Sequence, residues 1–312
     1  MTTPSPEACR LCGGVRHDAL QVQKAFRIPC EGEEVPFDIQ TMLCTTCGAV
    51  ATRPPPPADL LAAFYAGQER DAFIPGDEQR IPGEGSRRDQ AAWLDAQLGS
   101  LEGLHVLEIG CYEGFLLHLL RERGAVVQGI EPSLRAATLG MQRWGVPIEA
   151  GLFEGAALPE GHFDLIVLSH VLEHLLDPRE TLERCHRLLA PGGRLFVEVP
   201  NVLKPRVESA VDFFTFDHLW NFSPDVLGAL YRACGFEPGA LADDFPFPAF
   251  RLLGTRVDEP EPLRVPARTV DEVRDVVRGY GRARAEFVAR LRRRIDDELP
   301  RWEADRSRIA IY

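Results

Sequence analysis

The sequence lacks several features that would point to other functions. No apolar run approaches the ~20 residues that a membrane-spanning helix needs, and residues 1–7 do not form a signal segment. Positive charge is also in deficit, because 35 Lys and Arg face 47 Asp and Glu, a net charge of −12. Binding to phosphate backbones needs a basic face. We therefore expect a cytoplasmic protein with neither a membrane nor a nucleic acid as partner.

The glycines of a dinucleotide-binding turn are missing as well. That turn needs glycine at offsets zero, two and five, and the sequence has Gly110, Tyr112 and Phe115 there. Bulky side chains keep a pyrophosphate away from the backbone. A turn with Gly110 and Gly114, preceded by Glu108, suits a cofactor that carries adenosine without phosphates, namely S-adenosylmethionine.

The segment around this turn has the pattern of a nucleotide-binding unit. A buried strand at 104–109 leads into the turn, a helix follows at 115–123, and a second strand at 125–131 ends in Glu131. That acid lies 21 residues after Gly110, where such folds place the group that binds ribose hydroxyls. We expect further strands at 147–150, 163–169 and 193–199, helices between them, and an antiparallel pair near 236–256.

Residues from about 85 to 245 resemble a class I S-adenosylmethionine-dependent methyltransferase. The resemblance rests on Glu108–Gly114, with Tyr112 at the family's middle glycine, on Glu131, and on the segments 163–175 and 189–200. It implies an α/β, Rossmann-like sheet. The cofactor contacts that the turn, the sheet edge and the resemblance together predict are Glu108, Gly110, Cys111, Gly114, Glu131, Leu152, Phe153 and Ser169.

Four cysteines form two CxxC pairs near the N-terminus, Cys9 with Cys12 and Cys44 with Cys47. Four thiolates are the ligand set of a closed structural zinc site. A glycine follows each pair and allows the tight turn that a zinc knuckle needs. Unrelated free thiols or a redox pair are the alternatives. We expect structural zinc, with strands at 19–28 and 37–43 between the pairs.

These patterns divide the chain into three parts: a zinc-binding module at 1–57, a methyltransferase domain at 58–256 and a helical extension at 257–312. Prolines 54–57 form a stiff spacer, and we expect a short helix at 58–66. Residues 67–85 either cover the cofactor cleft or are mobile. A capping box at Thr269 opens a long helix, which is a candidate homodimer surface. Its apolar residues form one stripe: Val270, Val273, Val277, Tyr280, Phe287, Leu291 and Ile295. Residues 309–312 read like the start of a buried strand, so we expect the sequence to be truncated before a further domain.

Three histidines compete for the role of general base: His170, His174 and His218. His170 follows the strand at 163–169, at the edge where ligands bind in open sheets. His174 belongs to a motif shared by methyltransferases with different substrates, which favours a structural role. His218 lies beside Asp217 in an aromatic loop, on the side where the fold places its substrate, and a surface histidine is the alternative. We predict His218 and His170 as catalytic residues.

The predicted function is methyl transfer from S-adenosylmethionine to oxygen or carbon of a small molecule, such as a sugar, a sugar nucleotide or a natural-product intermediate. Sugar C-methyltransferases have a comparable histidine in the loop of His218, but their later His-Gly-Gly-Ser-like segment is absent. The alternatives are an RNA methyltransferase with a zinc module and a non-catalytic scaffold of the same fold.

Overall fold

The computed structural model describes residues 8–30, 33–57, 60–61, 83–209 and 212–304. The predicted helix at 58–66 lies almost wholly outside the described residues. The same holds for most of the segment 67–85 and for the strand expected at 309–312.

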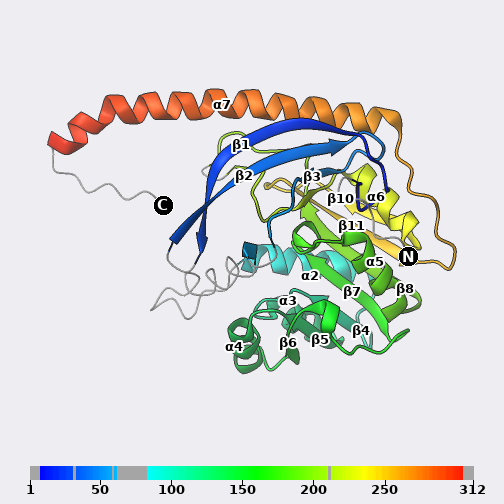
Figure 1. The fold of residues 1–312 in the computed structure, drawn as a ribbon. Helices are drawn as coiled ribbons and strands as arrows, with labels where there is room; N and C mark the ends of the chain where they lie inside the picture. The colour runs from blue at the N-terminus through cyan, green and yellow to red at the C-terminus, as the bar shows by residue number, and fades with distance from the viewer. Residues whose placement is uncertain (1–7, 31–32, 58–59, 62–82, 210–211, 305–312) are drawn as a thin grey trace.

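A seven-stranded sheet forms the centre of the protein (Figure 1), in the order β10-β11-β8-β7-β4-β5-β6. Its strands are β4 (His105–Ile109), β5 (Val126–Glu131), β6 (Ile148–Ala150), β7 (Phe163–Ser169), β8 (Leu189–Pro200), β10 (Phe236–Ala242) and β11 (Ala249–Arg256). The neighbours from β6 to β8 pair in parallel, while β11 runs antiparallel to both β8 and β10. This confirms the predicted α/β, Rossmann-like sheet and its antiparallel last pair.

Helices on the two faces bury the central parallel strands, which explains why β4 and β7 are mostly apolar. They are α2 (Glu84–Leu98), α3 (Phe115–Arg121), α4 (Leu134–Trp144), α5 (Pro178–Leu188) and α6 (Pro224–Ala233). Two predicted helix starts are confirmed by their caps. The Asp177 side chain accepts from the amide of Glu180, and Ser223 accepts from the amide of Val226.

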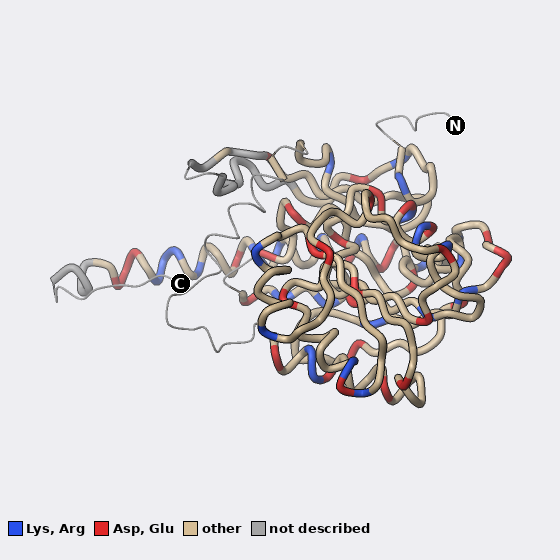
Figure 2. The backbone as a smooth tube through the Cα atoms, turned by 90° about the horizontal axis from the view of Figure 1, so that it is seen from below, with Lys and Arg blue, Asp and Glu red and all other residues tan. Residues whose placement is uncertain are grey.

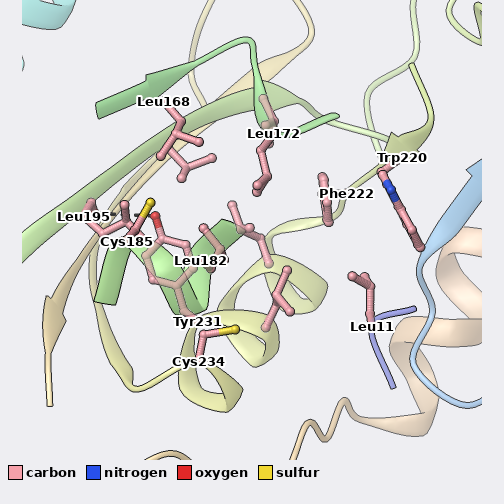
Figure 3. Packing of buried hydrophobic residues seen from close by; sticks show 14 of the residues in the cluster. Leu11, Leu168, Leu172, Leu182, Cys185, Leu195, Trp220, Phe222, Tyr231 and Cys234 are labelled. Carbon is pink, nitrogen blue, oxygen red and sulfur yellow. Dashed lines mark hydrogen bonds between the residues drawn. The ribbon is translucent and has the colours of Figure 1, made fainter. Parts of the chain in front are cut away.

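A second sheet joins the cysteine-bearing segment to the methyltransferase domain. Its order is β1 (His17–Cys30), β2 (Glu33–Cys44), β3 (Val50–Thr52) and β9 (Trp220–Asn221). β9 comes from the loop that the sequence assigned to the substrate side. The cores are continuous too, because Leu11 lies near Trp220 and Phe222 in one hydrophobic cluster with residues of β7, β8 and α6 (Figure 3). The cysteine-bearing segment therefore shares its hydrophobic core with the methyltransferase domain.

The C-terminal helix α7 (Ala267–Ala304) lies along the β1–β2 hairpin and then continues beyond it (Figure 1). Val270, Val273, Val277 and Tyr280 of the predicted stripe are buried. The helix begins two residues before the predicted capping box and runs past Pro300. Within the described residues, no helix combines the length and apolarity that crossing a membrane would require.

Candidate cofactor and active site

The turn after β4 has the backbone shape that its glycines predict. Gly110 has φ 69° and Gly114 has φ 67°, and a Cβ atom on Gly110 would come within 2.5 Å of Val171. Tyr112, at the family's middle glycine, also has a positive φ, 51°. A left-handed tyrosine is strained, and such strain is found mainly at functional sites.

Two carboxylates lie behind this turn at the ends of neighbouring strands. Glu131 ends β5 and accepts hydrogen bonds from the amides of Tyr112 (2.8 Å) and Ser133 (2.9 Å). These bonds hold the turn against β5 and place the Glu131 carboxylate directly behind it. Glu108, in β4, is 1% exposed, and neither of its carboxylate oxygens has a hydrogen-bond partner among the described residues.

Burying a carboxylate without a partner disfavours its ionised form and therefore raises its pKa. Burial raises the pKa of Glu108 to about 7, and the Glu131 carboxylate adds to this rise, although the Arg87 guanidinium and the backbone amide of Leu117 oppose it. A cationic ligand would compensate for the missing partner. S-adenosylmethionine carries a sulfonium and an ammonium group, so the residues present fit this cofactor.

A cavity of about 400 Å³ opens in front of the turn. This volume is in the range of small-ligand sites. Two predicted site residues, Cys111 and His170, line it. The other lining residues come from the turn, from α2 and its start, and from the loop before β11: Gly83, Ser86, Arg87, Gln90, Tyr112, Glu113, Phe115 and Phe247.

A buried polar network forms the wall between α2 and the strand ends. Gln90 donates to Ser169 Oγ (2.7 Å) and to Glu198 Oε1 (2.7 Å), and Arg87 also donates to Ser169 Oγ (2.6 Å). Glu198 forms an ion pair with Arg251 of β11. Ser169, a predicted cofactor residue, is therefore held in place by the helix that lies over the cavity.

His170 stands at the edge of this network with a positive φ of 55°. Its Nδ1 lies 3.3 Å from Glu173 and its Nε2 lies 3.2 Å from Glu198. Burial alone would lower the pKa of His170, but hydrogen bonds to the two carboxylates outweigh it and raise the pKa to about 9. At neutral pH His170 is therefore an imidazolium, a form that cannot accept a proton.

His218 and His174 are neighbours, with ring centroids 4.9 Å apart. His174 Nδ1 lies 2.9 Å from the carbonyl oxygen of Asp217, and its Nε2 lies 3.9 Å from Glu173. Contacts therefore lead from His170 at the cavity through Glu173 and His174 to His218, which is set back from the cavity. Burial lowers the pKa of His218, and the nearby His174 lowers it further. His218 is thus neutral at physiological pH.

Two groups of side chains in the described residues could hold a metal ion. One consists of Glu173, His174 and His218, with ligand atoms within 4.8 Å of one another. Glu173 already faces the His170 imidazolium, so its charge is balanced without a metal, and we assign none there.

The other group contains all four predicted cysteines. Sγ of Cys9 lies 3.8 Å from that of Cys47, and Sγ of Cys12 lies 3.6 Å from that of Cys44. Zinc–sulfur bonds of 2.3 Å in a tetrahedron set the sulfurs about 3.8 Å apart. Gly13 and Gly48 both have positive φ, and each donates its amide to the carbonyl oxygen of the first cysteine in its pair. The two turns therefore have the same geometry, and it is the geometry of a zinc knuckle.

Leu152 and Phe153, both predicted cofactor contacts, differ in exposure. Leu152 is 65% exposed, whereas Phe153 is buried in the core with the Arg184 guanidinium 4.3 Å from its ring centroid. Gly151 donates its amide to the Glu131 carbonyl oxygen, so Leu152 begins close to the predicted ribose acid. Of the two, Leu152 is the side chain available to a ligand.

Sequence reasoning missed the polar residues that surround the cavity. Gln90, Glu198 and Arg251 are all buried. Glu198 had a detectable signal, because it is an acid in the apolar strand Leu195–Val199 and buried charges need partners. No feature of the sequence marked Gln90 or Arg251 as site residues, since polar residues are common in helices and in the last strands of a sheet.

The strand order and the turn define a class I S-adenosylmethionine-dependent methyltransferase fold. The chain belongs to the methyltransferase domain family, whose model matches residues 81–240.

Curated relatives agree with this family. The ubiquinone biosynthesis O-methyltransferase of Pseudomonas aeruginosa is 36% identical over 115 residues, 35% of this chain and 49% of that protein. The enzyme of the same name from Pseudomonas entomophila is 32% identical over 166 residues, 46% of this chain and 69% of that protein. The chain thus spans about half the length of the first of these relatives. A solved structure, the 1,6-didemethyltoxoflavin-N1-methyltransferase of Burkholderia thailandensis, is 20% identical with a TM-score of 0.49, over 67% of this chain and 96% of that one.

Proposed function

We propose that this protein transfers the methyl group of S-adenosylmethionine to a hydroxyl oxygen of a small organic acceptor. The observation that carries the choice of cofactor is the buried Glu108 carboxylate, which has no hydrogen-bond partner by geometry among the described residues. The family supports methyl transfer, and the two curated relatives are named O-methyltransferases. Sugars, sugar nucleotides and natural-product intermediates with a hydroxyl group remain the acceptor classes of this proposal.

The bound cofactor supplies an electrophilic methyl group on a sulfonium ion. In this proposal Glu131 accepts hydrogen bonds from the ribose hydroxyls and Glu108 balances the positive charge of the cofactor. Gly110, Cys111 and Gly114 shape the turn beside it, Leu152 covers the adenine, and Ser169 fixes α2 over the cavity. Methyl transfer depends largely on such alignment in a site that excludes water.

We propose His218 as the base that removes the acceptor's proton. Its lowered pKa keeps it neutral, and its buried Nδ1 has no hydrogen-bond partner among the described residues. His170 is a cation at the cavity wall, and it serves to position Glu173 and Glu198. Because His218 does not line the cavity, the role requires that the acceptor or its loop bring the proton within hydrogen-bond reach.

We further propose one structural zinc ion at Cys9, Cys12, Cys44 and Cys47. The support is the convergence of four sulfurs at tetrahedral spacing and the matched glycine turns. The ion would hold the segment whose strand β3 pairs with β9. His218 lies two residues before β9, and its carbonyl oxygen accepts a hydrogen bond from Thr52 of β3.

An RNA acceptor is the second candidate, and the charge distribution disfavours it. Positive and negative residues are interspersed along the chain (Figure 2). An arginine-rich groove does exist, lined by Arg278, Arg282, Arg284 and Arg292, but it lies between β1 and α7. None of its lining residues belongs to the cofactor cavity.

Calorimetry and a product assay test the proposal together. The protein should bind S-adenosylhomocysteine and not NAD, and it should release S-adenosylhomocysteine in the presence of sugar, sugar-nucleotide or other hydroxyl-bearing acceptors. His218→Ala should lower turnover by roughly 10²–10⁴ with unchanged cofactor affinity, whereas His162→Ala, at an exposed histidine, should change neither. Failure to bind S-adenosylhomocysteine would overturn the cofactor assignment. Normal turnover in His218→Ala would contradict only the assignment of His218 as the base.

A further inference from the structure

The two halves of α7 have different surroundings. Its first half packs on the body through buried valines, whereas Leu291, Ile295 and Leu299 are 46%, 39% and 39% exposed. These three residues are spaced by four and therefore share one face of the helix. This half of the helix projects beyond the hairpin (Figures 1 and 2). It is an exposed apolar stripe without a partner among the described residues.

The charges on this half are arranged symmetrically about Ile295. Three arginines, 292–294, precede it, and three acids, Asp296, Asp297 and Glu298, follow it. Leu291 and Leu299 stand four residues before and after the same centre. Within the helix Arg294 reaches Glu298 at 3.7 Å, but its side chain is 80% exposed, and exposed pairs of this kind contribute little to stability. The helix alone therefore does not explain the pattern.

We propose that two copies of the protein pair through α7 in antiparallel orientation, with a two-fold axis at Ile295. In this arrangement Ile295 packs on Ile295 of the second copy, and Leu291 of each copy lies near Leu299 of the other. Arg292 and Arg294 of each copy then lie beside Asp296 and Glu298 of the other, whereas Arg293 and Asp297 lie on the far side of the helix. Such a surface is self-complementary, as an isologous dimer interface must be.

The same charge pattern favours an antiparallel orientation and a second copy of this protein as the partner. A parallel pair would place arginines beside arginines and acids beside acids, which is unfavourable. An antiparallel copy of this helix presents the required charges in the required order, so no other protein is needed to satisfy them. A seam made by one helix from each copy is smaller than the ~1,600 Å² of a standard stable interface. We therefore expect a dimer that dissociates on dilution.

Sedimentation velocity of the intact protein over a range of concentrations tests the existence of the dimer. Wild type should shift from monomer to dimer as its concentration rises. Ile295→Arg should remain monomeric, because it buries a charge at the two-fold axis. Leu241→Arg is the matched control, since Leu241 is 49% exposed on the edge strand β10, and it should dimerise like wild type. A monomeric wild type, or a dimer lost in Leu241→Arg and kept in Ile295→Arg, overturns the proposal.

Charge swaps test the antiparallel register. R292E/R294E should be monomeric, because its helix then carries only acids beside the apolar stripe and repels its copy. R292E/R294E/D296R/E298R reverses the whole pattern. It should dimerise with itself like wild type but not with wild type, since a mixed antiparallel pair would place like charges together, whereas a parallel arrangement predicts pairing with wild type only. Circular dichroism of each variant checks that α7 is intact. A folded reversed variant that stays monomeric alone, or that pairs with wild type, overturns the antiparallel arrangement.

Discussion

At the scale of single residues, the proposed role of Glu108 in cofactor binding makes its burial testable. Burial raises its pKa to about 7, well above the 4.5 of a free glutamate. The ionised form is therefore destabilising in the ligand-free protein. This cost first appears as the pH rises above 4.5, and it is complete above pH 7, where it is on the order of 3 kcal/mol.

Replacing Glu108 should change the stability of the ligand-free protein and its affinity for the cofactor in opposite directions. We expect Glu108→Gln to raise the melting temperature of the ligand-free protein at pH 8 and to weaken S-adenosylmethionine binding, because an amide carries no charge. Wild-type affinity should increase as the pH rises from 6 to 8, by about tenfold, since the cation prefers the ionised acid. Isothermal titration calorimetry across this range measures the effect.

The control is another carboxylate of the same cavity. Glu113 pairs with Arg143 at 3.4 Å, and Glu113→Gln should retain the pH dependence because Glu108 is still present. A Glu108→Gln variant that is no more stable than wild type at pH 8, or whose affinity still rises with pH, contradicts this account.

At the scale of elements, the sequence predicted the strands and turns well where local signals were strong. The strand at 163–169 and the caps of α5 and α6 are confirmed, because apolar runs and capping residues act locally. The pairing of β3 with β9 was not foreseen. It joins residues that are about 170 apart in the sequence, and no local pattern encodes such a contact.

The residues of the candidate site divide in the same way, into those positioned by one local unit and those brought together from distant elements. Gly110, Gly114 and Glu131 were predictable because one strand–turn–helix–strand unit positions them. Gln90, Glu198 and Arg251 come from three distant elements, and only the sheet order brings them together. The surroundings of His218 also depend on the fold, because its neighbours are His174, from the short 3-10 helix Leu172–His174, and Thr52, from the cysteine-bearing segment.

The turn after β4 offers a direct test at this scale. Gly110→Ala should both unfold more easily and bind S-adenosylmethionine at least tenfold more weakly, since the added Cβ would clash with Val171 at 2.5 Å in a left-handed backbone conformation. Gly279→Ala in α7 is the control, with no atom within 4 Å of the added Cβ. It should be slightly more stable than wild type, because alanine favours helix. Thermal unfolding and calorimetry compare the two, and equal behaviour would mean that the turn tolerates a side chain.

At the scale of the whole molecule, the cysteine site and the methyltransferase domain are coupled. The sequence suggested separate modules, but one hydrophobic cluster contains Cys9, Leu11 and Cys47 together with Trp220 and Phe222. The Arg179 side chain of α5 also donates to the Leu11 carbonyl oxygen at 2.9 Å. Losing the proposed zinc ion should therefore affect more than the N-terminal segment.

Replacing Cys44 and Cys47 with serine tests this coupling. We expect about one zinc per wild-type chain by metal analysis and none in the double variant. Turnover should fall together with zinc, because β3 holds β9 and the His218 loop, and denaturant unfolding should remain one transition at a lower midpoint. Cys234→Ser, at a buried cysteine outside the cluster of four, should keep both zinc and turnover. If the zinc-free variant keeps normal turnover, or unfolds in two separate steps with the methyltransferase domain unchanged, the cysteine site stabilises only its own segment and the two parts are independent.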